Sequence, residues 1–115
     1  MRLTFPYPIS VNALYRNVPG VGRVKTERYK TWARAAGNEI LTQKREKISG
    51  PVEIRITIAR KKGNNIDIDN GAKGIIDLLA ATAEKGGMSL IDDDRNVQRL
   101  TIEWGDETAI EVDAA

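Results

Sequence analysis

A strict alternation of side chains from Val52 to Ala59 limits the possible folds more than any other part of the sequence. Branched apolar residues occupy every second position of this segment, and polar ones lie between them: Val52, Ile54, Ile56 and Ile58 against Glu53, Arg55 and Thr57. Successive side chains of a β-strand point to opposite faces, so the spacing predicts a strand with one buried and one exposed face. The rest of the chain must supply a layer that covers the buried face.

Two segments with helical spacing flank this strand. Thr26 is a suitable N-cap, and the residues after it predict a helix that continues to about Lys47. Its expected apolar positions are Tyr29, Trp32, Ala33, Ala36, Ile40 and Leu41. A second helix is predicted from about Asp69 to Lys85, before Gly86-Gly87, with an apolar arc formed by Ala72, Ile75, Ile76, Leu79 and Ala83. We interpret Trp32 as a core residue, while the role of Tyr15, in a loop beside Arg16, stays open between packing and stacking on a ligand.

Further short strands complete the expected layout. Strands are predicted for Arg2–Phe5 and Val97–Trp104, with a possible short one at Arg23–Lys25. Gly105-Asp106-Glu107 is expected to turn the chain back into Thr108–Val112, which would form a C-terminal hairpin. The pattern predicts an α+β fold, with a small mixed or antiparallel sheet and two main helices packed on it. A chain of 115 residues is expected to form one domain, residues 1–115.

The amino-acid composition excludes several kinds of site. The chain has neither Cys nor His, which removes the usual zinc ligands and every Cys/His nucleophile–base pair. Any bound metal is therefore expected to be a hard cation with oxygen ligands. No apolar run is long enough for a signal peptide or a membrane span, so we expect a cytoplasmic protein without a membrane partner.

Charge is distributed unevenly along the chain. Residues 1–62 contain 14 Lys and Arg against 4 Asp and Glu, whereas residues 63–115 contain 4 against 12. A basic half of this kind indicates a polyanionic partner, although an unevenly charged solvated surface is an equal alternative on composition alone. If the partner is DNA, the expected phosphate contacts are Arg16, Arg23, Lys25, Arg28, Lys30, Arg60, Lys61 and Lys62.

Acidic residues gather at two places in the second half. Asp67 and Asp69 lie where the predicted second helix begins, and Asp92-Asp93-Asp94 precedes the predicted strand at Val97. Carboxylates that meet repel one another unless a cation lies between them, and Mg²⁺ accepts such oxygen ligands. Lys73, one helical turn after Asp69, could contact a scissile phosphate or its leaving oxygen. The alternative is structural, with Asp69 as a helix N-cap and Asp92–Asp94 as a solvated loop.

Three motifs in this sequence resemble the RusA-type crossover-junction endodeoxyribonucleases. Asp67-Ile68-Asp69-Asn70-Gly71-Ala72-Lys73-Gly74-Ile75-Ile76-Asp77-Leu78-Leu79 is similar to that family's D-x-D-N-x-x-K-x-x-x-D-x-L signature. Asp93-Asp94-Arg95-Asn96-Val97 resembles its D-D-x-Q-V element, and Pro8-Ile9-Ser10-Val11-Asn12-Ala13-Leu14-Tyr15-Arg16 resembles its P-x-S-x-N-x-x-Y-R stretch. The matches occur in family order and lie within residues 6–97.

The resemblance implies a specific function, which composition and residue spacing alone do not identify. It implies a homodimeric, RusA-like α+β endonuclease that resolves Holliday junctions by paired symmetric cuts, in a bacterial or phage-infected cell. Its cofactor would be Mg²⁺, for which Mn²⁺ is expected to substitute, and its partner four-way junction DNA. It further implies that Asp67, Asp69 and Asp94 bind the metal, with Asp93 as the alternative third ligand, and that Lys73 assists catalysis.

Two other functions fit the residues less well. A Mg²⁺-dependent nucleotide phosphohydrolase would need a phosphate cradle, and the sequence has no P-loop. A non-catalytic DNA-binding module would use the basic half for DNA and the acidic half for a protein partner.

Overall fold

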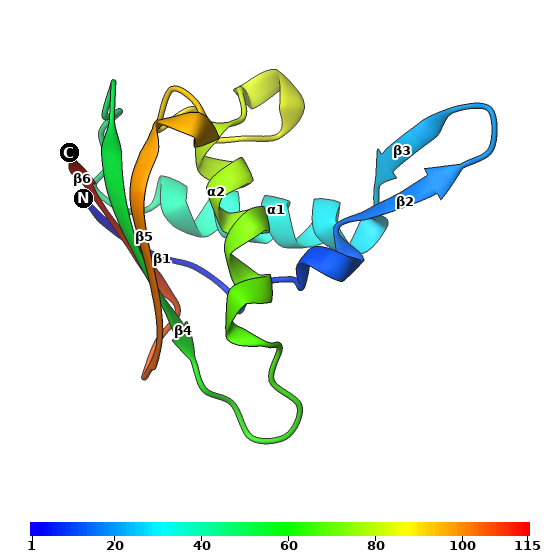
Figure 1. Ribbon diagram of the computed structural model, residues 1–115, viewed down its shortest axis with the longest axis horizontal. Helices are drawn as coiled ribbons and strands as arrows, with labels where there is room; N and C mark the ends of the chain where they lie inside the picture. Colours follow the sequence, from blue (N-terminus) through cyan, green and yellow to red (C-terminus); the bar gives the residue numbers. More distant parts are fainter.

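A computed structural model describes all residues from Met1 to Ala115. Its main feature is a four-stranded mixed sheet in the order β1 (Arg2–Thr4), β6 (Ala109–Ala114), β4 (Val52–Ala59) and β5 (Val97–Gly105). β4 runs parallel to β5 and antiparallel to β6, and β6 is antiparallel to β1. Helices α1 (Glu27–Leu41) and α2 (Ala72–Ala80) lie on one side of this sheet (Figure 1). The α+β class and the mixed sheet with two main helices are therefore confirmed.

The predicted strand at Val52–Ala59 is confirmed over its full length, and it is central to the sheet. Its four branched apolar side chains are at most 2% exposed, whereas Glu53 and Arg55 on the other face are exposed. The buried face packs with Tyr29, Trp32, Ala36 and Ile40 of α1 and with Ile75 and Leu79 of α2 in one hydrophobic core. The interpretation of Trp32 as a core residue is confirmed.

The predicted C-terminal hairpin is wrong. The turn after Gly105 does reverse the chain, but β5 and β6 do not pair with each other, because β4 lies between them. The end of β4 is held in this gap: the Ala59 amide donates to the Thr108 hydroxyl at 3.1 Å, and the Arg60 amide donates to the Gly105 carbonyl at 3.2 Å. As a result Ile110 and Val112 of β6 are fully buried.

Helix α1 begins where the sequence predicts and ends earlier. The Thr26 hydroxyl accepts a hydrogen bond from the Tyr29 amide, as expected of an N-cap. The helix ends at Leu41 instead of Lys47, because Gln43 turns toward β1, where its side-chain amide exchanges hydrogen bonds with the backbone of Thr4 at 2.8 and 2.7 Å. Leu41, predicted to be on the apolar face, is 55% exposed.

Helix α2 is also shorter than predicted. A 3-10 turn, η2 (Ile68–Gly71), precedes it, and a separate 3-10 turn, η3 (Ala83–Lys85), follows it after a break. Ala83 is therefore exposed instead of belonging to the apolar arc, whereas Leu78 is buried. Gly74 allows the close approach of α2 to the N-terminal region, since an added Cβ would lie 3.2 Å from Leu14.

A two-stranded antiparallel hairpin extends away from the body of the molecule (Figure 1). It consists of β2 (Tyr15–Val18) and β3 (Gly22–Lys25), of which the sequence predicted only the second. Gly20 and Gly22 at its tip have φ angles of 76° and 99°, which favour glycine. At the base, the Thr26 hydroxyl donates to the Ala13 carbonyl at 2.7 Å. None of the helices is long and apolar enough to cross a membrane.

Candidate active site

Lys73 lies between two carboxylates that come from different parts of the chain. Its ammonium group is 3.0 Å from Asp77 Oδ1, one turn further along α2, and 3.7 Å from Asp94 Oδ2. Asp94 begins a 3-10 turn, η4 (Asp94–Asn96), which contacts α2. The hydrogen bond to Asp77 raises the pKa of Lys73, so this side chain is protonated at neutral pH.

Asp77 also connects this site to the base of the hairpin. The Tyr15 hydroxyl lies 3.5 Å from Asp77 Oδ2, at the limit of a hydrogen bond. Burial, and then the nearby Asp77 charge, raise the pKa of the Tyr15 phenol. The Tyr15 ring packs edge-on against Tyr29 and lies 4.1 Å below the guanidinium of Arg23. Tyr15 is therefore half-buried and links β2, α1 and α2.

The three consecutive aspartates differ in their partners. Asp92 accepts a hydrogen bond from the Gly50 amide at 2.9 Å and lies 3.2 Å from the Lys47 ammonium; these contacts, the Gly50 bond first, lower the pKa of Asp92. Asp93 accepts both side-chain and backbone hydrogen bonds from Arg95, which hold the pKa of Asp93 well below its usual range. Asp94 faces Lys73 instead.

The first acidic pair lies at the other end of the same helical segment. Asp67 precedes η2 and Asp69 is inside it; both side chains are exposed, and neither forms an ion pair. Gly71, and not Asp69, occupies the N-cap position of α2, and no side chain caps that helix. The interpretation of Asp69 as a structural N-cap is therefore wrong.

The donor chemistry of these aspartates fits a hard divalent cation, but the side chains do not converge on one point. Their carboxylate oxygens are the ligands that Mg²⁺ takes in proteins. No group of three or more acidic side chains lies close enough to hold one ion. Since Mg²⁺ commonly uses one or two carboxylates with phosphate oxygens and water, two of these carboxylates and a bound phosphate would suffice.

The predicted basic residues lie at three places around this site. Arg16, Arg23 and Lys25 are on the hairpin, Arg28 and Lys30 are in the first turn of α1, and Arg60, Lys61 and Lys62 follow β4. Several cations rest on aromatic rings, which orients them: Arg60 is 4.8 Å from the Trp104 ring and Lys61 is 4.2 Å from the Tyr7 ring. Seven of these eight side chains are exposed and available to an anionic partner, and Lys25 is half-buried.

The sequence predicts only part of what holds Lys73 in place. Asp69, Lys73 and Asp77 recur every four residues, which places them on one polar side of the expected helix, and the Lys73–Asp77 pair is confirmed. No local signal indicated that Tyr15 would reach Asp77, because this contact joins residues 62 positions apart.

Comparison with known proteins identifies the group to which the chain belongs. In this α+β fold a lysine lies between two carboxylates, beside exposed basic residues that can meet an anionic substrate. The family model described as Endodeoxyribonuclease RusA matches residues 6–114. The chain therefore belongs to the RusA family of endodeoxyribonucleases, as its motifs indicated. None of the curated proteins compared with the chain matches it.

Proposed function

We propose that this protein is a Mg²⁺-dependent endonuclease that resolves four-way DNA junctions by paired, symmetric hydrolysis of phosphodiester bonds. The observation that carries the proposal is the position of the Lys73 ammonium, 3.0 Å from Asp77 and 3.7 Å from Asp94, in a chain of the RusA family. A cation held among carboxylates at an exposed site can meet a phosphate that approaches from solvent.

Each acidic residue has a distinct role in this proposal. Asp67, Asp69 and Asp94 would hold the Mg²⁺ ion together with phosphate oxygens. Bound Mg²⁺ would supply a water of lowered pKa and stabilise charge on the reacting phosphate. Asp92 and Asp93 have structural partners in Gly50, Lys47 and Arg95, which favours Asp94 as the third ligand.

Lys73 acts as a fixed positive charge. Its ammonium has three N–H donors, of which Asp77 takes one, so others can bind a nonbridging or leaving oxygen of the scissile phosphate. Its raised pKa means that it donates a hydrogen bond or a proton and does not act as a general base. Asp77 is a positioning residue, since it reaches the reaction only through Lys73.

The basic residues would bind the arms of the junction. Contacts to phosphates give affinity and orientation without reading the base sequence, which suits an enzyme selective for branched DNA. The hairpin is well placed for this role, because it projects from the body and starts beside Asp77 (Figure 1).

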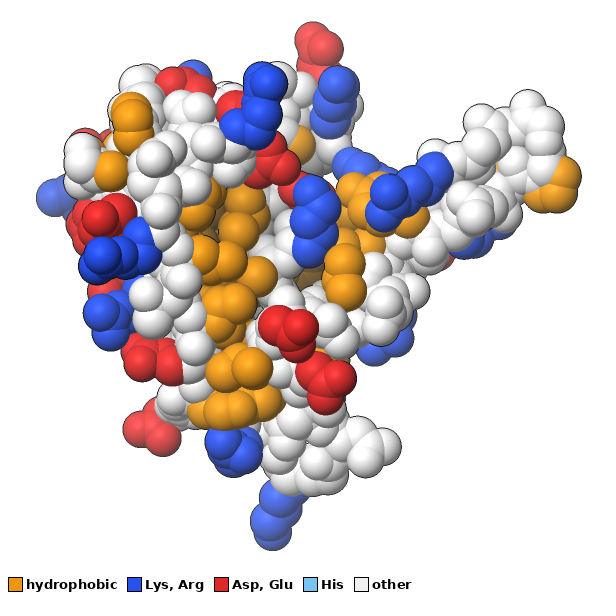
Figure 2. All heavy atoms as spheres, in the orientation of Figure 1, with side chains coloured by type: hydrophobic (Ala, Val, Ile, Leu, Met, Phe, Trp, Pro, Cys, Tyr) orange, Lys and Arg blue, Asp and Glu red, His pale blue; other side chains and the backbone are white.

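A second copy of the chain would provide the second cut. Leu100, Ile102 and Trp104 of β5 pair with the buried residues of β4 and point to the core side of the sheet, yet Leu100 is 42% exposed and the other two are half-buried. Figure 2 shows apolar surface between β5 and α2. β5 is also an open sheet edge, and an apolar face beside such an edge favours association. A twofold pair is the simplest arrangement that makes two equivalent cuts.

One assay separates this proposal from its alternatives. Purified protein is incubated with labelled four-way junction, linear duplex of the same sequence, and nucleoside triphosphates, each with and without Mg²⁺. We expect cleavage of the junction alone, and only with metal. Hydrolysis of the triphosphates would support a nucleotide phosphohydrolase, and binding without any cleavage would support a DNA-binding module.

A further inference from the structure

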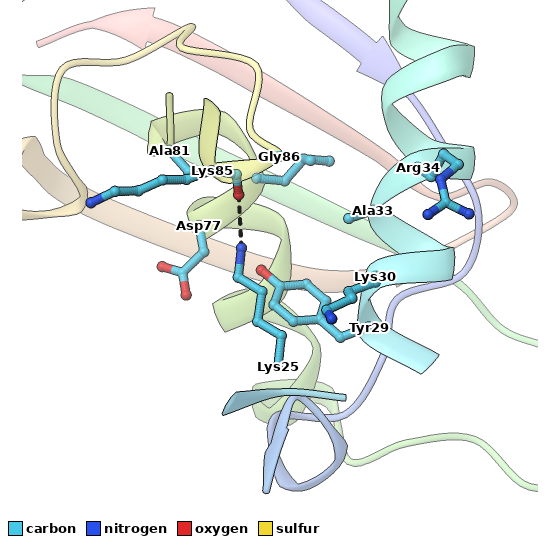
Figure 3. A pocket seen from close by; sticks show the side chains of 10 residues that line it. Lys25, Tyr29, Lys30, Ala33, Arg34, Asp77, Ala81, Lys85 and Gly86 are labelled. Atoms are coloured by element: carbon cyan, nitrogen blue, oxygen red, sulfur yellow. Dashed lines mark hydrogen bonds between the residues drawn. The ribbon is translucent and has the colours of Figure 1, made fainter. Parts of the chain in front are cut away.

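A hollow lined by cations lies between the first half of α1 and the segment that follows α2. Its volume is about 340 Å³ (Figure 3). Tyr29 and Ala33 of α1, with Leu78 and Ala81, form an apolar floor. Three basic side chains surround this floor: Lys25, Lys30 and Arg34. Lys85 also lines the hollow, but its side chain points away from Ala33 and Arg34 (Figure 3). Arg34 and Lys85 were not among the basic residues that the sequence singled out.

The charge in this hollow is strongly positive. Asp77 is the one acidic residue in its lining, and its carboxylate is already paired with Lys73. Arg34 and Lys85 form no ion pair, and the Lys25 ammonium donates to the Lys85 carbonyl at 2.8 Å instead of meeting a carboxylate. Lys30 has an exposed partner, Glu27, at 3.4 Å, which neutralises it weakly. Several unneutralised cations around a concave surface attract an anion.

This basic hollow is continuous with the acidic site. A second hollow, of about 310 Å³, is lined by Asp92, Asp93 and Asp94 and by five residues that also line the first: Lys25, Tyr29, Asp77, Ala81 and Lys85. The two hollows therefore form one trough, acidic at one end and basic at the other. A DNA strand with one phosphate at Asp94 would pass its neighbouring nucleotide toward the basic end.

We infer that the basic hollow binds a single unstacked nucleotide of the strand being cut. The apolar floor fits a sugar or a planar base, and the surrounding cations fit the phosphate. A volume near the lower end of the range for small-molecule pockets suits one nucleotide and not a base pair. Nucleotides at a branch point can leave the stack at lower cost than those inside a duplex. The pocket would thus favour branched over linear DNA, an inference that rests on the proposed function.

The test measures nucleotide binding without cleavage. The metal-free protein is titrated with the single-stranded dinucleotide pTpT, and binding is followed by amide chemical shifts in NMR spectra. We expect millimolar binding with shifts concentrated at Ala33, Leu78, Ala81 and Lys85. The double variant Lys30→Ala/Arg34→Ala should bind about tenfold more weakly for each cation removed, which equals about 1.4 kcal/mol each.

Two further variants separate a pocket from general attraction to a basic surface. Lys44→Ala/Arg45→Ala removes the same charge beyond the C-terminal end of α1, outside the hollow, and should bind pTpT almost normally. Ala33→Met fills the floor without changing charge and should also weaken pTpT binding, with thermal unfolding as the check on folding. Absence of binding, shifts spread over the whole basic surface, or equal losses in both double variants would overturn the inference.

The same variants in the junction assay separate the two proposals. Cleavage of the junction by a protein that does not bind pTpT would overturn the pocket alone. Localised pTpT binding by a protein that never cuts the junction would overturn the proposed function alone.

Discussion

Replacement of Lys73 by alanine is the sharpest single test of the candidate site, because its effects on stability and on cleavage should differ widely. The Lys73 side chain is 45% exposed, and its pair with Asp77 spans one helical turn. Exposed pairs of this spacing contribute about 0.3–0.5 kcal/mol to stability. For a domain of this size, such a loss lowers the melting temperature by roughly 1–2 °C.

Cleavage should respond far more strongly than folding. If the ammonium binds the scissile phosphate in the transition state, its removal resembles the loss of one oxyanion-stabilising donor. Such losses cost about 2.7–4 kcal/mol, which lowers kcat about 10²- to 10³-fold. Junction affinity should change little, because the remaining basic residues supply most phosphate contacts. Removal of the lysine also takes a positive charge away from Asp77 and Asp94. Their carboxylates would then attract a metal ion more strongly, so weaker metal binding would not explain a loss of cleavage.

The assay is single-turnover cleavage of a labelled junction at saturating protein and Mg²⁺, with gel-shift affinity measured without metal. Lys44→Ala serves as the matched control, since Lys44 is also exposed and lies outside both hollows. Wild-type rates in Lys73→Ala would refute the catalytic role. A rate loss accompanied by an equal loss of affinity would show that Lys73 only binds DNA.

The remaining predictions concern the metal, the third ligand, the dimer and the effect of pH. Junction cleavage should require Mg²⁺ or Mn²⁺ while junction binding persists without metal, and robust cutting in EDTA would refute this. Among Asn substitutions, Asp94→Asn should bind junctions as well as or better than the unaltered protein and fail to cut; Asp93→Asn should be impaired through loss of the Arg95 contacts, and Asp92→Asn nearly normal. An active Asp94→Asn beside an inactive Asp92→Asn would show that the ligand register is wrong. Light scattering should find a dimer that Leu100→Asp dissociates, whereas a monomeric unaltered protein, both free and junction-bound, would contradict the second-copy argument. Burial raises the pKa of Tyr29 above its ordinary value of 10.0, so this phenol ionises in the unfolded chain before it does so in the folded one. The urea midpoint should therefore fall as the pH rises above about 10, and should fall less in Tyr29→Phe; an identical pH dependence in both would argue against it.

The sequence predicted those parts of the fold whose signals are local. Val52–Ala59 alternates with period two, and Thr26 caps the helix that follows it, so both elements lie where they were expected. The prediction of a C-terminal hairpin was wrong because a turn at Gly105 reverses the chain whether or not the strands on either side of it pair with each other. The insertion of β4 between β5 and β6 joins residues about 50 positions apart, and no short-range pattern carries that information.

In the candidate site too, local spacing predicted some contacts, and contacts between distant segments could not be predicted. Helical spacing placed Lys73 near Asp77, but its approach to Asp94 depends on η4 packing against α2, 21 residues further along the chain. The motif resemblance named Asp67, Asp69 and Asp94 together, yet their side chains do not converge. Carboxylates that approach one another repel, so their convergence would require a bound cation. In the proposed mechanism, the phosphate and the ion would arrive together and draw these side chains inward. A bound junction would therefore increase the affinity of the protein for Mg²⁺, because the junction phosphate would supply oxygen ligands to the ion and the ion would supply positive charge to the phosphate.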